Sequence, residues 1–85
     1  MIELYHAETC PYCVKVRVVL EKEGIAYISK PVPLGSATTP LKEELKRIAG
    51  KTQVPFIVDA AKNVSMHESD DIIAYIKQNY AQNNR

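Results

Sequence analysis

The sequence predicts an α/β fold with one mixed four-stranded sheet flanked by three helices. The chain of 85 residues is 46% hydrophobic and 25% charged, so we expect residues 1–85 to form a single globular domain. Segments with strand-like apolar patterns alternate with segments of helical spacing, in the order β-α-β-α-β-β-α. A helix joins the first two strands, which favours parallel pairing, and a short turn joins the last two, which favours antiparallel pairing.

The first half of the chain is expected to form a strand, a helix and a second strand, at residues 2–5, 11–23 and 25–32. The first strand alternates apolar and polar side chains. Pro11 suits the first position of the helix, because its missing N–H would have no partner there, and Gly24 is a typical helix stop. Prolines end the second strand, because a proline cannot donate to a sheet.

The second half is expected to form a helix, two short strands and a final helix, at residues 40–49, 56–58, 64–66 and from 70 onward. Thr39 suits the cap of the helix at 40–49 and Gly50 its end, whereas Asp70 and Asp71 favour a helix start through the helix dipole. Residues 82–85 are expected to fray. The residues expected to face the core are Leu41, Leu45 and Ile48 in the helix at 40–49, and Ile72, Ile73, Ile76 and Tyr80 in the final helix.

The charge of the chain is nearly balanced, with eleven Lys and Arg residues against ten Asp and Glu residues. A net charge of +1 supplies no field that would gather nucleic acid or an anionic membrane, so we expect neither as a partner. No apolar run approaches the about 18 residues of a membrane span. Residues 1–4 lack the basic start and apolar stretch of a secretory signal, so we expect a cytoplasmic protein. The default expectation for its oligomeric state is a monomer.

The two cysteines, Cys10 and Cys13, lie three residues apart at the start of the first predicted helix. A disulfide this local closes a very small loop, so it would contribute little as a structural crosslink. Free N–H groups at the helix start would point toward the sulfur of Cys10 and favour its thiolate, the reactive form of cysteine. We therefore predict that Cys10 is the nucleophile and Cys13 the resolving thiol of a redox disulfide.

Zinc binding is the alternative use of such a cysteine pair. A closed zinc site needs four ligands, usually from a second cysteine pair or from two histidines. The sequence offers only His6 and His67, and neither has a partner at ligand-like spacing. We therefore expect no metal site, because a CxxC pair beside a βαβ pattern is typical of redox proteins.

Three elements together resemble the dithiol glutaredoxins of the thioredoxin-like superfamily. They are Thr9-Cys10-Pro11-Tyr12-Cys13, Thr52-Gln53-Val54-Pro55 and Ser69-Asp70-Asp71. The resemblance implies a thioredoxin-like (glutaredoxin) fold. It also implies a glutathione-dependent thiol-disulfide oxidoreductase that reduces protein disulfides and glutathione mixed disulfides. Its partners would be glutathione and disulfide-containing or glutathionylated proteins, with glutathione as co-substrate and no permanently bound cofactor.

The resemblance also implies how glutathione is bound. The Val54–Pro55 peptide would be cis, exposing the Val54 backbone to the cysteinyl part of glutathione. The start of the last helix would bind the γ-glutamyl carboxylate, and Asp70 would accept from its ammonium group. The glutathione-binding residues implied in this way are Tyr12, Lys51, Gln53, Val54, Pro55, Glu68, Ser69 and Asp70.

Two positions depart from the glutaredoxin pattern. Ala7 stands where many members have a lysine, and His67-Glu68 replaces the usual Gly-Gly before the last helix. The segment Glu68-Ser69 is similar instead to glutathione-transferase N-terminal domains, which bind the γ-glutamyl end there. Two alternatives therefore stay open. The chain could be a glutathione-transferase-like binding domain, or an iron–sulfur carrier with Cys10 and glutathione as cluster ligands. The sequence names neither the protein substrate nor the reduction potential.

Overall fold

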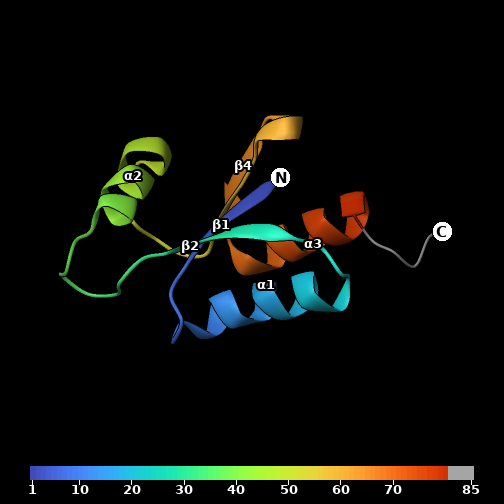
Figure 1. Ribbon diagram of the computed structural model, residues 1–85, viewed down its shortest axis with the longest axis horizontal. Coiled ribbons are helices and arrows are strands. Elements are labelled where there is room, and N and C mark those ends of the chain that lie inside the picture. The colour runs from blue at the N-terminus through green and yellow to red at the C-terminus, as the bar shows by residue number, and fades with distance from the viewer. Residues whose placement is uncertain (81–85) are drawn as a thin grey trace.

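The computed structural model describes residues 1–80 and contains one four-stranded sheet with three helices (Figure 1). The elements in chain order are β1 (Ile2–His6), α1 (Pro11–Lys22), β2 (Tyr27–Pro31), α2 (Pro40–Ala49), β3 (Phe56–Asp59), the 3-10 helix η1 (Ala60–Lys62), β4 (Val64–His67) and α3 (Ser69–Tyr80). The predicted order of strands and helices is confirmed. The expected fraying of residues 82–85 lies outside the described residues.

The sheet has the strand order β2-β1-β3-β4. Strand β1 is parallel to β2 and antiparallel to β3, and β3 is antiparallel to β4, so the predicted mixed sheet is confirmed. Tyr5 lies opposite Phe56, which in turn lies opposite His67. The end of β1, the start of β3 and the end of β4 therefore share one edge of the sheet. The loops that leave this edge bring residues from distant parts of the chain together.

The helices cover both faces of the sheet (Figure 1). Helices α1 and α3 pack on one face, where side chains that are nearly inaccessible to solvent form the larger core. Helix α2 packs on the other face, through Leu45 against Tyr5 and Phe56. The larger core consists of Ile2, Leu4, Val16, Leu20, Ile57, Ile72 and Ile76. The strict alternation of β1, with Leu4 toward α1 and Tyr5 toward α2, follows from the period of a strand.

Helix α2 differs from the prediction in the residues that it buries. Leu45 is buried as expected, but Ile48 is 50% exposed, so its expected place in the core was wrong. Lys42 is buried instead, because its ammonium group donates to the carbonyls of Gly35 and Ala37 at 2.6 and 2.8 Å. These two hydrogen bonds satisfy the buried charge and tie the loop before α2 to the helix.

The boundaries of the other elements agree with the prediction to within two residues. Strand β2 is shorter than expected at both ends, and the Ile25 amide is used instead in the turn after α1, donating to the Leu20 carbonyl at 2.9 Å. Helix α3 begins one residue earlier than Asp70. Among residues 1–80, no helix combines the length and the apolar character that crossing a bilayer requires.

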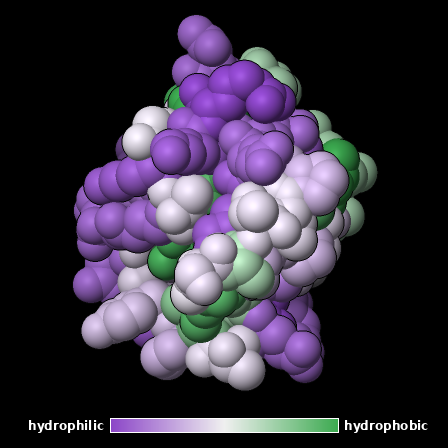
Figure 2. Space-filling view, turned by 90° about the vertical axis from the view of Figure 1, so that its left-hand side faces the viewer, coloured by the Kyte–Doolittle hydropathy of each residue, from purple (hydrophilic) through white to green (hydrophobic). Residues whose placement is uncertain are grey.

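The surface at the α2 end of the molecule is mostly polar, with an apolar area low on the face and another at its right-hand edge (Figure 2). In Figure 1, α1 lies at the bottom of the molecule and begins on the side where α2 lies. The redox pair predicted from the sequence lies at this end of α1.

Candidate functional site

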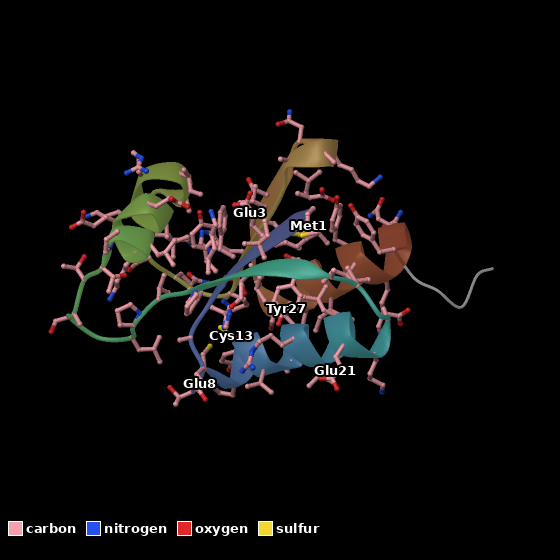
Figure 3. All side chains as sticks on the ribbon, in the orientation of Figure 1. Met1, Glu3, Glu8, Cys13, Glu21 and Tyr27 are labelled. Atoms are coloured by element: carbon pink, nitrogen blue, oxygen red, sulfur yellow. The ribbon has the colours of Figure 1, made fainter. Side chains whose placement is uncertain are left out.

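The candidate site lies at the edge of the sheet where β1 ends, β3 begins and β4 ends. Figure 3 shows Cys13 at the end of α1 that lies near Glu8, with Glu21 at the far end of the same helix. The Cys10–Cys13 segment follows β1, the Gln53–Pro55 segment precedes β3, and Glu68 follows β4. The sheet register therefore brings together all three motifs that the sequence analysis singled out.

Cys10 caps the start of α1. Its backbone is extended, with φ −80° and ψ 115°, and its sulfur accepts a hydrogen bond from the Cys13 amide at 3.4 Å. Pro11 takes the first helical position, and the Val14 amide donates to the Cys10 carbonyl at 3.0 Å. The sulfur of Cys10 thus occupies the usual place of a capping oxygen at the start of α1.

Cys13 lies one turn further along and is fully buried, whereas Cys10 is 7% exposed. Both are free thiols. Burial, with a lesser contribution from the neighbouring Cys10 thiol, raises the pKa of Cys13 to about 12, against the opposing effects of the Ala7 backbone and of Arg17. Cys13 is therefore protonated near neutral pH, which leaves Cys10 as the thiol that solvent and substrates reach first.

Val54 joins the cysteine pair to the segment before β3. The Val54–Pro55 peptide is cis, as the resemblance implied. The Val54 side chain packs against the cluster of Ala7, Cys10 and Cys13. Within residues 1–80, the Val54 backbone makes no hydrogen bond, so its N–H and C=O are available to a ligand.

A groove of about 260 Å³ lies beside the cysteine pair. Its lining residues come from α1, from the loop before β3 and from the start of α3. They are Tyr12, Gln53, Val54, Pro55, Glu68, Ser69 and Asp70. The structure thus brings together seven of the eight residues that the resemblance implied for glutathione. Lys51, the eighth, is exposed and does not line the groove.

The start of α3 forms one end of the groove. Ser69 is 7% exposed, and the Ile72 amide donates to the Glu68 carbonyl at 2.9 Å, which closes the first turn of the helix. Glu68 has a positive φ of 78°. Its carboxylate accepts a hydrogen bond from the Gln53 amide group at 3.1 Å, so both side chains are held at the rim of the groove.

An ion pair lies at this end of the groove. The Lys15 ammonium lies 3.0 Å from a carboxylate oxygen of Asp70 and 5.8 Å from the centre of the Tyr12 ring. The sequence analysis did not predict this ion pair, because 55 residues separate its members and only the packing of α1 beside α3 brings them together. Both side chains are at least half exposed, so the pair is worth less than about 1 kcal/mol.

The two histidines have structural surroundings. His6 is buried at the end of β1, with its Nε2 atom 2.6 Å from the Ser29 hydroxyl. The His67 ring packs against the Phe56 ring at a tilt of 45°, with the ring centroids 4.5 Å apart. Burial lowers the pKa of both rings, so both are neutral near pH 7. Over residues 1–80, no three His, Cys, Asp or Glu side chains converge in a way that could hold a metal ion.

The chain is similar to known proteins both in sequence and in fold. Residues 4–84 match the family model described as the glutathione S-transferase N-terminal domain. The chain is 32% identical to glutaredoxin 3 of Escherichia coli K12 over 73 residues, which cover 86% of this chain and 82% of that protein. It is 30% identical to glutaredoxin 1 of Rickettsia prowazekii over 78 residues, covering 91% of this chain and 78% of the relative.

Solved structures of similar fold include the glutathione transferase URE2P6 from Phanerochaete chrysosporium, in complex with oxidised glutathione. The TM-score is 0.79 at 25% identity, over 96% of this chain and 37% of that one. The chain therefore spans little more than a third of the length of the transferase that it matches.

Proposed function

The chain belongs to the glutaredoxins of the thioredoxin-like superfamily, with a segment like the glutathione S-transferase N-terminal domain, and on this premise we propose that it is a glutathione-dependent thiol-disulfide oxidoreductase. It reduces protein disulfides and glutathione mixed disulfides through Cys10 and Cys13. Glutathione is its co-substrate, and no cofactor is permanently bound. A dithiol with this role works in a reducing compartment such as the cytoplasm.

The observation that carries the proposal is the contact between the two cysteines beside the groove. The Cys13 amide donates to the Cys10 sulfur at 3.4 Å, and the groove next to it has a volume of about 260 Å³. A thiolate at a helix start, with a second thiol one turn behind it, is suited to thiol-disulfide exchange. The unpaired Val54 backbone next to Cys10 supports a peptide-like thiol as the partner.

The reaction consists of two exchanges. The Cys10 thiolate attacks one sulfur of the substrate disulfide, a mixed disulfide forms, and the other sulfur leaves as a thiolate that takes up a proton. Cys13 then attacks the Cys10 sulfur, which forms the Cys10–Cys13 disulfide and releases the second substrate thiol. Two glutathione molecules supply the two electrons that return the pair to dithiols, leaving as glutathione disulfide. With a glutathione mixed disulfide on Cys10, a second glutathione can take the place of Cys13.

The groove offers complementary groups to each part of glutathione. The Val54 backbone pairs with the cysteinyl unit and aligns its sulfur with Cys10. The amides at the start of α3, next to Ser69, receive the γ-glutamyl carboxylate, while Glu68 and Asp70 accept from the ammonium group. Gln53 and, from outside the groove, Lys51 approach the glycyl carboxylate, and Tyr12 covers the bound tripeptide.

The test is glutathione-driven reduction of two substrates, a small glutathione mixed disulfide and a protein disulfide. Cys10→Ser is expected to lose both activities, because the one remaining cysteine, Cys13, is fully buried and protonated near neutral pH. Cys13→Ser is expected to lose reduction of the protein disulfide and to keep much of the activity on the mixed disulfide, since glutathione replaces the resolving thiol. Steady-state rates with both substrates measure the split.

Full activity of Cys10→Ser on either substrate would end the proposal. The same preparations also address the second candidate function, a transferase-like glutathione-binding domain, which the family match over residues 4–84 favours. Conjugation of glutathione to an aryl halide by Cys10→Ser and by the unmodified chain alike, without disulfide reduction, would favour that second function.

A further inference from the structure

Arg17 is a cation beside the cysteine pair that is not neutralised by a carboxylate. Its guanidinium donates through Nη2 to the Glu8 carbonyl at 3.2 Å. Its Nε atom is buried and makes no hydrogen bond, and among residues 1–80 no ion pair includes Arg17. Lys15, the other cation on this part of α1, is paired with Asp70. Within the described residues, the positive charge of Arg17 is therefore not offset by an ion pair and can act on neighbouring groups.

Arg17 lies on the same face of α1 as Cys13 and does not line the groove. Residues four apart share one face of a helix, so Arg17 lies one turn below Cys13 on the side that packs against β1 and the loop after it. Cys13 is fully buried on that side, and Arg17 is half-buried. The hydrogen bond to the Glu8 carbonyl holds the guanidinium under the turn that carries Cys10.

The groups that face Cys13 have opposing effects on its ionisation. Burial and the Cys10 thiol raise the pKa of Cys13, whereas the Ala7 backbone and the Arg17 charge lower it. From β1, the His6 ring also faces Arg17, and burial together with the Arg17 charge lowers the pKa of His6, so that this ring stays neutral. Ala7, where many glutaredoxins have a lysine, supplies no charge.

We propose that Arg17 is a positioning residue for the resolving step, in which its guanidinium stabilises the Cys13 thiolate that attacks the mixed disulfide on Cys10. The proposal rests on the oxidoreductase function proposed above. In this step the Cys13 sulfur forms a bond to the Cys10 sulfur, and the bond between Cys10 and the bound thiol breaks. The bound thiol leaves as a thiolate, and that leaving group takes up the proton that Cys13 gives up.

The expected size of the effect follows from thiol chemistry. The proposal predicts a thiolate fraction of Cys13 that is about tenfold smaller without the Arg17 charge. A more basic thiolate is also about threefold more nucleophilic, so the resolving step should slow about threefold. Capture by Cys10 should change less, because the group that donates to the Cys10 sulfur is the Cys13 amide at the helix start and not Arg17.

The experiment follows the reaction of the reduced full chain with an activated aromatic disulfide, which releases a coloured thiolate in each step. Capture by Cys10 releases the first equivalent, and resolution by Cys13 releases the second. Stopped-flow absorbance therefore gives both rates for the unmodified chain, Arg17→Met, Arg17→Lys and the control Lys22→Met, which removes an exposed cation from the far end of α1. Thermal melts establish that each variant is folded, and Arg17→Gln replaces Arg17→Met if the latter does not fold.

The second equivalent should appear about threefold more slowly in Arg17→Met or Arg17→Gln, and at a rate within about twofold of the unmodified chain in Arg17→Lys and Lys22→Met. An unchanged second step in Arg17→Met would overturn the proposal. Equal slowing in Arg17→Lys would overturn it too, since the hydrogen bond and not the charge would then matter. Equal slowing in Lys22→Met would show that any cation on α1 has the same effect, and would also overturn it.

The result is separable from the proposed function. An Arg17-dependent second step in a chain without glutathione-driven activity would refute the oxidoreductase assignment and leave the role of Arg17 standing. Glutathione-driven activity with a second step that is indifferent to Arg17 would refute the role of Arg17 alone.

Discussion

Glu68 holds a backbone conformation that residues with a side chain rarely adopt. Its φ of 78° lies in the left-handed region, where the Cβ atom approaches the following carbonyl at a cost of about 1–2 kcal/mol. The glutaredoxin pattern has Gly-Gly before the last helix, and glycine adopts this conformation without that cost. The chain instead places a carboxylate there, which accepts from Gln53 at the rim of the groove. Backbone strain at this position is thus linked to a side chain that can reach a ligand.

Two substitutions at this residue separate backbone strain from side-chain contact. Glu68→Ala and Glu68→Gly both remove the hydrogen bond to Gln53, but only glycine relieves the left-handed strain. We expect the free energy of unfolding of Glu68→Gly to be about 1 kcal/mol higher than that of Glu68→Ala. Urea unfolding followed by circular dichroism measures the difference, and equal stability of the two variants would contradict the expectation.

The strands and helices are joined by polar contacts as well as by the core. Asp59, at the end of β3, is fully buried and accepts hydrogen bonds from Tyr75 at 2.7 Å and Tyr80 at 2.5 Å, both on α3. Burial raises the pKa of Asp59, but the hydrogen bonds from Tyr80 and Tyr75 outweigh burial and hold it below its usual value. The ionised carboxylate therefore fixes the last turns of α3 to the sheet.

This contact predicts that the free energy of unfolding falls at low pH. Because the folded pKa of Asp59 lies below the unfolded value, its contribution is present above about pH 4 and is lost as the pH falls through the folded pKa. Asp59→Asn should therefore lose less unfolding free energy between about pH 7 and about pH 3 than the unmodified chain does. Urea unfolding at both pH values measures this difference.

Glu8 provides the control, since it is an exposed carboxylate in the loop between β1 and α1, outside any helix. Glu8→Gln should follow the unmodified chain across the same pH range. If Asp59→Asn and the unmodified chain lost equal stability in acid, the Asp59 carboxylate would not be the group that ties α3 to the sheet.

At the scale of the whole molecule, the sequence predicted the fold well because its pattern is local. Helix caps, prolines and apolar spacing set the order of the elements, and connection lengths set the parallel and antiparallel pairing. The one wrong core residue is Ile48, which is 50% exposed. Two buried polar residues went unpredicted because their partners lie elsewhere in the chain: the Lys42 ammonium donates to the loop carbonyls of Gly35 and Ala37, and the Asp59 carboxylate accepts from two tyrosines of α3.

The sequence predicted which motifs meet at the site, but not the side-chain contacts between packed helices. The motifs at Cys10, Val54 and Ser69 lie on loops that the strand register brings to one edge, so their association follows from the predicted topology. The ion pair of Lys15 with Asp70 depends on side-chain positions on two packed helices, which the sequence pattern does not specify. The exclusion of Lys51 from the groove lining has the same origin.

The account depends most on the division of labour between the two cysteines, and mapping the glutathione adduct tests it most directly. The reduced Cys13→Ser and Cys10→Ser variants are treated with oxidised glutathione, digested without reductant and analysed by mass spectrometry. We predict one glutathione on the peptide that contains Cys10 in Cys13→Ser, and none in Cys10→Ser, because the remaining Cys13 is buried and protonated. A stable adduct on Cys13, or no adduct on Cys10, would contradict the account.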